Sequence, residues 1–296
     1  MLDRTQQHFE RLPLMAATPR TADRPCRITN DAMKPLAHTV ARFCGTLARL
    51  PDGDGSKAQL VACRRSAFQV MPSDPYEQAV HVRRRLAHLA AGIDEARAGT
   101  ITNTQRSLRQ LQHAYRSLQG LMIGVPDRLL NFEPGSGRCT IRHVLQRALA
   151  GTAMPACFVQ HISSTAPCAC RSCPGTLSAI FEIGEHVYRA VVEGLRDAPD
   201  LSFEPGTTRG GSLSLIIHAR VDRLSRHLLD HQVELRRLLK SAGHRRTLSM
   251  RLAHRIFMVL GDAEGAMIGA ESRFEGTCQP LIDLIAARTD ELARYR

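Results

Sequence analysis

One nine-residue pattern occurs twice in this chain, as LNFEPGSGR at residues 130–138 and as LSFEPGTTR at residues 201–209. In both copies an apolar helical segment ends near a Pro-Asp pair, a Phe-Glu-Pro-Gly turn follows, and Ser or Thr precedes the next apolar segment. Proline and glycine interrupt helices, and a hydroxyl side chain caps the start of one. The repeat therefore predicts one helix-turn-helix hairpin used twice. A single hairpin leaves its apolar stripe uncovered, so the two together predict a four-helix bundle.

Apolar residues at alternating gaps of three and four predict the first bundle helix, which starts near residues 102–104 and stops at Pro126. Its stripe consists of Leu108, Leu111, Tyr115, Leu118, Met122 and Val125. Further helices are expected at residues 31–50, 74–98, from 141 onward, 177–196, 212–241, 247–261 and 279–294, with Ser73 or Asp74, Thr140 and Ser212 as N-caps. No segment alternates apolar and polar residues with period two, so we expect an all-α fold.

These segments predict four regions. Residues 1–30 contain Pro13, Pro19 and Pro25 without a helical period, and we expect them to form a disordered tail. N-terminal helices are expected at residues 31–103, the four-helix bundle at 104–243, and C-terminal helices at 244–296.

The chain is basic, with a formal net charge of +12. Such a surface attracts phosphates and other anions, but net charge does not determine the fold. The basic residues are spread as Arg64-Arg65, Arg83 to Arg85, Arg236-Arg237 and Arg245-Arg246. No aromatic residues lie between them to stack on bases, which favours solvated helix faces over a nucleic-acid patch.

Localisation follows from what the sequence lacks. The segment MLDRTQQHFERLPLM contains acids and no apolar stretch, which predicts no signal peptide. No run reaches the roughly 18 apolar residues of a membrane-spanning helix, so no membrane partner is expected. Nine cysteines at irregular spacing are typical of free thiols in a reducing, cytoplasmic setting.

Two histidines form the main candidate site. The helix expected at 212–241 has one apolar stripe, and His231 occupies a position in it. His227 lies one turn earlier, on nearly the same face. Imidazoles at i and i+4 are a known metal-ligand spacing, although a divalent cation needs a third ligand. The alternative is a core histidine that bonds another side chain, with His227 at the rim.

The helix order and two segments, TIRHVLQRAL from Thr140 and RHLLDHQVELRRLLKSAG from Arg226, resemble the DinB/YfiT-like family over roughly residues 104–243. The resemblance implies a four-helix bundle of two pseudo-twofold hairpins, with a metal, often zinc or nickel, held by three histidines. Family members that are enzymes include thiol-dependent transferases, isomerases and some hydrolases, and many members have no assigned activity.

Carried over by this resemblance, His227 and His231 match two of the three ligands. The third falls on Arg147, whose guanidinium does not ligate metals. His143, one turn earlier, is the tentative replacement, and His186 is a further alternative. Without a metal, Arg147 beside neutral imidazoles would bind an anion such as a carboxylate or phosphate. With one, Glu182 or Glu185 is a candidate base.

A second candidate lies in the segment APCACRSCPG, where Cys168, Cys170 and Cys173 form a C-x-C-x-x-C pattern. Three thiols this close can bind zinc, with Cys157 or His161 as a fourth ligand, or can exchange disulfides. No second cysteine pair accompanies them, and incidental loop thiols are the favoured interpretation.

The sequence therefore predicts a DinB-like, metal-dependent transferase or hydrolase, whose site is degenerate if the third ligand is missing. Zinc or nickel is the expected metal, a thiol is a candidate cosubstrate, and a small molecule is the candidate substrate. The alternatives are a non-enzymatic helical interaction module and a basic nucleic-acid-binding protein that uses residues 81–85 and 236–246. A homodimer is compatible with either. Substrate and reaction do not follow from the sequence.

Overall fold

The computed structural model describes residues 33–50, 74–97, 101–135, 139–149, 176–196, 210–270 and 275–295, without the side chains of 210–218, 220 and 275. The chain divides into two units, Met1–Asp31 and Ala32–Arg296, and every described residue lies in the second. These ranges contain helices and turns and no strand, which confirms the all-α prediction. The first repeat copy is described only to residue 135, and the second copy, the tail at 1–30 and the cysteine segment lie outside the described ranges.

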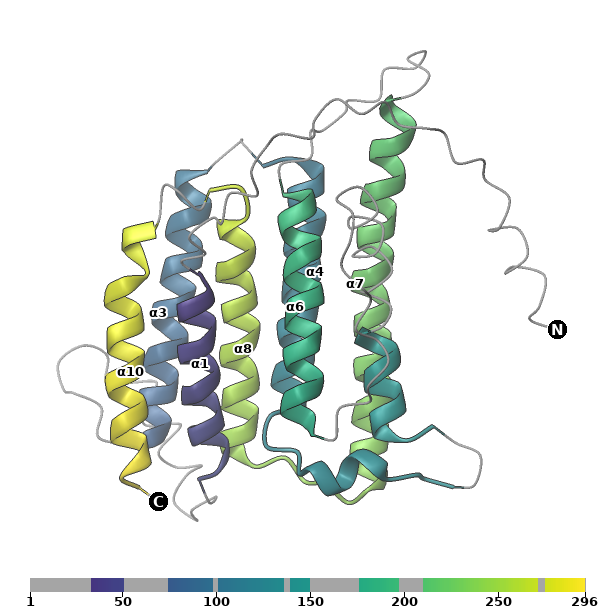
Figure 1. Ribbon diagram of the computed structural model, residues 1–296. Coiled ribbons are helices and arrows are strands. Elements are labelled where there is room, and N and C mark those ends of the chain that lie inside the picture. The colour runs from purple at the N-terminus through teal and green to yellow at the C-terminus, as the bar shows by residue number, and fades with distance from the viewer. Residues whose placement is uncertain are drawn as a thin grey trace. The chain divides into compact units, whose positions relative to one another are not determined.

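The helices follow one another along the chain as shown in Figure 1. They are α1 (Met33–Ala48), α3 (Pro75–Ala96), α4 (Asn103–Met122), η1 (Asp127–Asn131), α6 (Leu177–Leu195), α7 (Gly210–Ser241), α8 (Leu248–Met267), η2 (Glu275–Thr277) and α10 (Gln279–Ala293). Residues 141–149 are also helical. None of the helices in the described ranges is long and apolar enough to cross a membrane.

Side-chain caps explain where several helices begin. Asp74 accepts a hydrogen bond from the Tyr76 amide at 2.6 Å, with Pro75 following in the first turn. Thr102 forms a capping box with Gln105. Thr140 accepts a hydrogen bond from the His143 amide at 3.1 Å, and helix 141–149 starts directly after it. The caps predicted at Asp74 and Thr140 are therefore confirmed.

Two helix ends differ from the sequence prediction. Helix α7 begins at Gly210, so Ser212 lies inside the helix and is not its cap. Helix α8 continues to Met267, past the predicted end at residue 261. Gly261 and Gly265, which lie at and beyond the predicted end, allow α8 to pack closely against α4.

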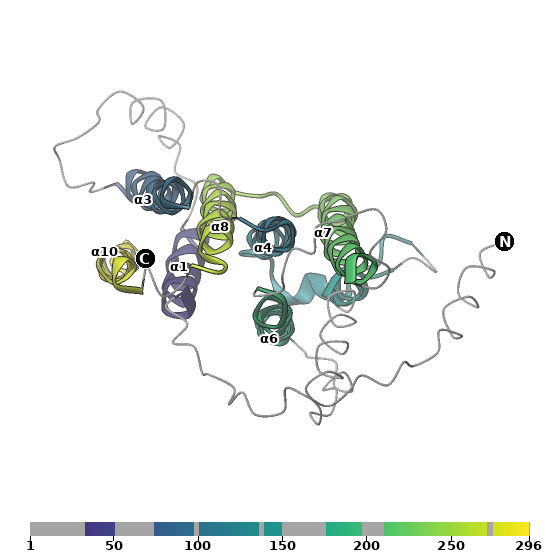
Figure 2. The same cartoon turned by 90° about the horizontal axis from the view of Figure 1, so that it is seen from above.

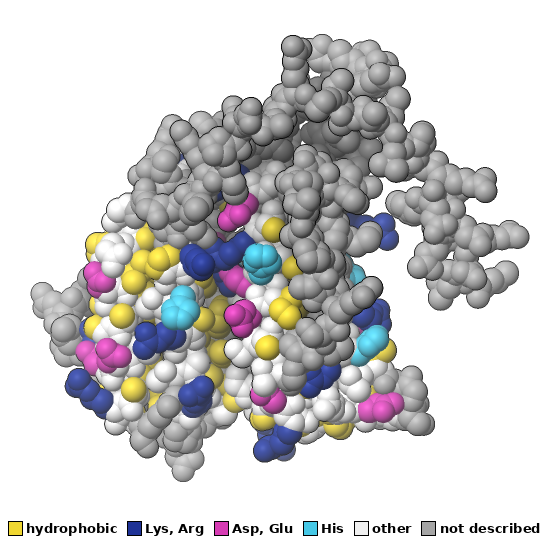
Figure 3. All heavy atoms as spheres, viewed as in Figure 1, with side chains coloured by type: hydrophobic (Ala, Val, Ile, Leu, Met, Phe, Trp, Pro, Cys, Tyr) yellow, Lys and Arg dark blue, Asp and Glu magenta, His cyan; other side chains and the backbone are white. Residues whose placement is uncertain are grey.

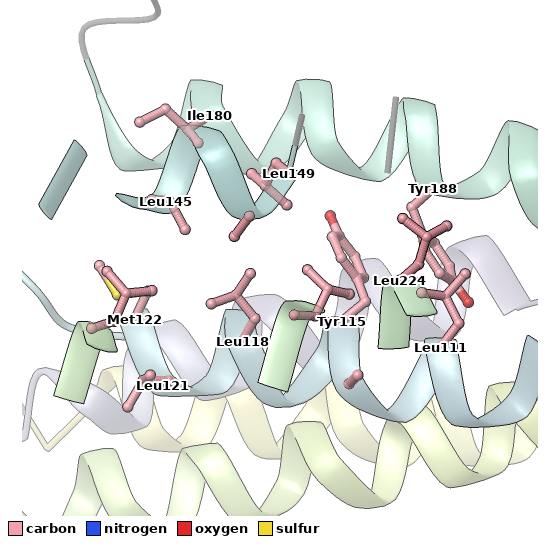
Figure 4. Close-up of a cluster of buried hydrophobic side chains, with 14 of the residues drawn as sticks. Leu111, Tyr115, Leu118, Leu121, Met122, Leu145, Leu149, Ile180, Tyr188 and Leu224 are labelled. Carbon is pink, nitrogen blue, oxygen red and sulfur yellow. The ribbon is translucent and has the colours of Figure 1, made fainter. Parts of the chain in front are cut away.

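The described helices form two hydrophobic cores. The first, here called the bundle core, combines residues from α4, 141–149, α6 and α7. All six apolar residues of the predicted α4 stripe are buried in it, and Figure 4 shows several of them facing α6 and helix 141–149. The second core combines α1, α3, α8 and α10. The N- and C-terminal helices, predicted as separate regions, thus pack together.

Helices α4 and α8 join the two cores along a close contact. A Cβ atom added at Gly120 of α4 would lie 2.9 Å from the His254 Cα and 2.9 Å from the Phe257 Cβ of α8. A Cβ added at Gly261 of α8 would lie 3.0 Å from the His113 Cα of α4. Only glycine permits this approach of the two backbones, because any side chain would displace one helix.

We expect Gly120→Ala to destabilise the protein by about 1–3 kcal/mol, because the added methyl group meets backbone that cannot move freely. The free energy of unfolding from denaturant titration measures the effect. Gly92→Ala on α3 is the matched control, since a Cβ there meets nothing within 4 Å. That control should raise stability by about 0.5–1 kcal/mol through helix propensity. Equal stability of the two variants would contradict the close contact.

Candidate functional site

The two predicted histidines lie next to each other on α7. Their ring centroids are 4.3 Å apart and the ring planes are nearly perpendicular, at 87°. His231 is buried in the stripe that faces the bundle core, whereas His227 is half-buried at its edge. His227 Nε2 donates a hydrogen bond to the backbone oxygen of Arg147 at 3.2 Å, which links α7 to helix 141–149.

His231 is held in one tautomer. Its Nδ1 lies 3.1 Å from a carboxylate oxygen of Glu234, and since a carboxylate only accepts, Nδ1 carries the proton. Its Nε2 is buried without a hydrogen-bond partner in the described residues, and it presents a lone pair. Burial lowers the pKa of His231 and outweighs the hydrogen bond to Glu234, and the charges of His227 and Arg147 lower it further. The ring is therefore neutral near pH 7.

The structure does not bring a third donor to this pair. Among the described residues, no group of three or more His, Cys, Asp or Glu side chains is placed to hold a metal ion. His143 is exposed on helix 141–149, and His186 is exposed on α6. The Arg147 side chain is exposed as well, with one nitrogen 4.0 Å from the Cys139 Sγ. The thiols Cys168, Cys170 and Cys173 lie outside the described ranges.

A buried ionic network that the sequence did not indicate lies where α4, α6 and α8 meet. Arg116 of α4 is only 3% exposed and forms two-pronged ion pairs with two carboxylates. Its contacts to Glu264 of α8 are 2.5 and 2.6 Å, and those to Glu185 of α6 are 2.7 and 2.8 Å. Gln112 also donates to Glu264, and Arg189 donates to Glu185 at 2.8 Å. The candidate base Glu185 is thus held by two arginines.

The two carboxylates of this network differ in their electrostatic environment. Burial raises the pKa of Glu264, and the Arg116 guanidinium only partly opposes it. Burial also acts to raise the pKa of Glu185, but Arg116 and Arg189 outweigh it and the pKa is lowered. Glu185 is therefore a fixed anion near neutral pH, while Glu264 depends on Arg116 to remain one.

Two tyrosines border this network inside the bundle core. The rings of Tyr115 and Tyr188 stack with centroids 4.6 Å apart and planes 2° from parallel, and Figure 4 shows both residues between α4 and α6. The Arg116 guanidinium lies 5.5 Å from the Tyr115 ring centroid. The Tyr188 hydroxyl is buried without a partner in the described residues, and burial raises its pKa well above the usual value. These rings fix α6 against α4.

A hydrogen-bonded chain links α4, α7 and α8 beside the contact between α4 and α8. Arg246 donates to His254 Nδ1 at 3.0 Å, so the His254 Nε2 carries the proton and donates to the Ser117 Oγ at 3.2 Å. Ser117 donates to the Gln232 oxygen at 2.8 Å, and Gln232 donates to the Ala114 oxygen at 2.9 Å. A serine that gives its proton away from the histidine is not an activated nucleophile, so this chain is structural.

Charges of both signs are mixed on much of the surface. Figure 3 shows basic, acidic and histidine side chains interspersed with apolar ones on the face in view. This agrees with solvated helix faces for the basic residues in view.

No family model, curated protein or solved structure matches this chain. The DinB-like resemblance of residues 104–243 therefore stays a prediction from the two motifs and the helix order. A functional proposal for this chain therefore rests on the geometry of the site.

We expect Arg116→Met to destabilise the protein by roughly 3–5 kcal/mol, because it leaves a buried carboxylate unpaired. Denaturant titration at pH 7 measures the loss. The matched control is Arg109→Met, which breaks the 2.6 Å pair with the more exposed Asp94 and should cost about 1 kcal/mol or less. Similar losses for the two variants would show that Arg116 does not hold buried charge.

The lowered pKa of His254 predicts that the stability of the protein depends on pH. Burial and the neighbouring Arg246 and Arg236 lower the pKa of His254 from 6.5 to about 4. Protonation therefore favours the unfolded chain, and stability present above pH 6.5 falls as the pH drops toward 4, by about 3 kcal/mol. His254→Gln should flatten the stability–pH curve in this window, while His88→Gln, at an exposed position on α3, should leave it unchanged. If the stability–pH curves of His254→Gln and the wild type run parallel, His254 is not the source of the pH dependence.

Proposed function

We propose that this chain is a metal-binding helical-bundle protein of the DinB-like type, with His227 and His231 as two of the ligands. The observation that supports the proposal is the state of His231. Its Nδ1–H is fixed by Glu234, and its Nε2 lone pair is buried without a partner in the described residues. Metal-ligating histidines have this arrangement, in which a carboxylate orients the ring and the other nitrogen binds the ion.

The same arrangement favours a cation over an anion. A neutral imidazole whose remaining nitrogen is a lone pair has no proton to donate to a carboxylate or phosphate. Burial, together with the charges of His227 and Arg147, lowers the pKa of His231, which keeps that lone pair available. A bound divalent cation would supply Lewis acidity toward a water or a thiol, the chemistry of the hydrolases and transferases that the resemblance implies. Glu234 would orient the ring.

Metal analysis of protein purified without a histidine tag tests the proposal. After incubation with zinc or nickel and removal of free ions, the wild type should retain about one equivalent. His231→Ala and His227→Ala should remove that metal, and Glu234→Gln should weaken binding about 10–100-fold. His143→Ala tests whether the third ligand suggested by the sequence contributes to binding.

The control is His88→Ala, an exposed histidine on α3 that should bind as the wild type does. Wild-type protein without stoichiometric metal, or full retention by His231→Ala, would overturn the proposal and leave the bundle as a scaffold.

A further inference from the structure

The strip of surface between α7 and α8, with α4 beneath it, is here called the groove. Helix α4 packs against both neighbours, and Figure 2 shows it between them in the view from above. This strip is hollowed at one end by a pocket of about 510 Å³. The floor of the pocket includes His113 of α4, one wall includes Asp222, Arg226 and Leu229 of α7, and the other includes Asp262 of α8.

Helix α7 carries exposed apolar side chains at this pocket and one turn beyond it. Leu229 and Val233 are both 45% exposed, and they lie one turn apart on the same side of the helix. Only two other large hydrophobic side chains are exposed in the described ranges, Ile183 and Tyr295. Two of the four thus lie next to each other on α7, and Leu229 also lines the pocket.

The other end of the groove is strongly basic. The sequence from Leu235 to Gly261 has seven Arg or Lys residues and no Asp or Glu. Six of the seven are exposed, and within the described ranges none of these six forms an ion pair; they are Arg236, Arg237, Lys240, Arg245, Arg251 and Arg255. Helical spacing extends the line of Leu229 and Val233 to Arg236 and Lys240.

Charges from both walls meet at this basic end. Spacings of three and four also place Arg251 and Arg255 in line with Asp262 on α8. Burial and the charges of Arg236 on α7 and Arg251 on α8 lower the pKa of Arg246 to about 10, so the three guanidinium groups are close enough to repel one another. A ligand that brings negative charge here would relieve that repulsion.

We propose that this groove binds an acidic amphipathic helix of a partner protein. The apolar side of such a helix would cover Leu229 and Val233, and its carboxylates would pair with Arg236, Arg251 and Arg255. A helix laid between two helices is a common recognition mode, with anchors spaced three and four residues apart. The exposed apolar pair favours this partner over a nucleic acid, for which phosphate contacts and base stacking would be needed. The proposal does not depend on a metal at His231.

A fluorescent synthetic peptide of about 18 residues tests the inference, with Leu at helical spacing on one side and Glu on the others. Fluorescence anisotropy with the full-length protein should give a Kd below about 50 μM. Leu229→Ser with Val233→Ser, and separately Arg251→Glu with Arg255→Glu, should each weaken binding about tenfold or more. All of these side chains are exposed, so the variants should fold, and circular dichroism checks that they do.

The matched control is Arg84→Glu with Arg85→Glu, an equal charge reversal at exposed positions of α3, which should change the Kd less than about twofold. A peptide with Lys in place of Glu should not bind. Equal weakening by the α3 variant would mean non-specific attraction and would overturn the inference. The inference would also be overturned if a 20-base-pair DNA duplex displaced the peptide and bound equally well to the Leu229 and Val233 variant. Absence of peptide binding up to about 1 mM would overturn it as well.

Discussion

The contact between α4 and α8 is the constraint on which the rest of the described structure depends. Helix α4 contributes its apolar stripe to the bundle core and α8 contributes to the second core, so this pair forms the most extensive contact between the two cores. Gly120, Gly261 and Gly265 let the backbones approach closely. A close contact leaves no room for water, so polar groups beside it must find partners within the protein. The polar networks around Arg116 and His254 both lie along this contact.

The Arg116 network adds specificity to this contact at an energetic cost. Taking three charges out of water is unfavourable, and two-pronged pairing offsets the cost only when all partners are present. Glu264 comes from α8 and Glu185 from α6, so Arg116 is satisfied only when both helices are correctly placed on α4. The stacked rings of Tyr115 and Tyr188 act in the same direction, because they also hold α6 at a fixed position. A network of this kind selects one packing arrangement over other hydrophobic ones, and we hold this as the hypothesis for its role.

Local patterns predicted the elements better than their assembly. The α4 stripe, the caps at Asp74 and Thr140 and the burial of His231 all followed from helical spacing and cap chemistry. The continuation of α8 past Gly261 to Met267 was not predicted, because the sequence does not show which glycines serve packing. Arg116 resembled any solvated arginine, since its partners are distant in the chain. Helix α4 is identified as the central helix by its buried residues, which lie on most sides of it. This burial can be seen only in the folded structure. The exposure of His143 and Arg147 could not be predicted for the same reason.

Helix α7 carries two candidate surfaces on different sides, the His227–His231 pair and the exposed Leu229–Val233 pair. One buried residue, Gln232, determines which way both surfaces face. His231 and Val233 flank Gln232, whose amide donates to the Ala114 oxygen and accepts from Ser117. These two bonds to α4 fix the rotation of α7 about its axis, because a buried amide left unpaired would be costly. With that rotation fixed, His231 faces the helix that contains Arg147, and Leu229 faces the groove beside α8. A partner helix in the groove would therefore lie against α7 without touching the imidazoles, and the two surfaces can act independently unless α7 itself rotates.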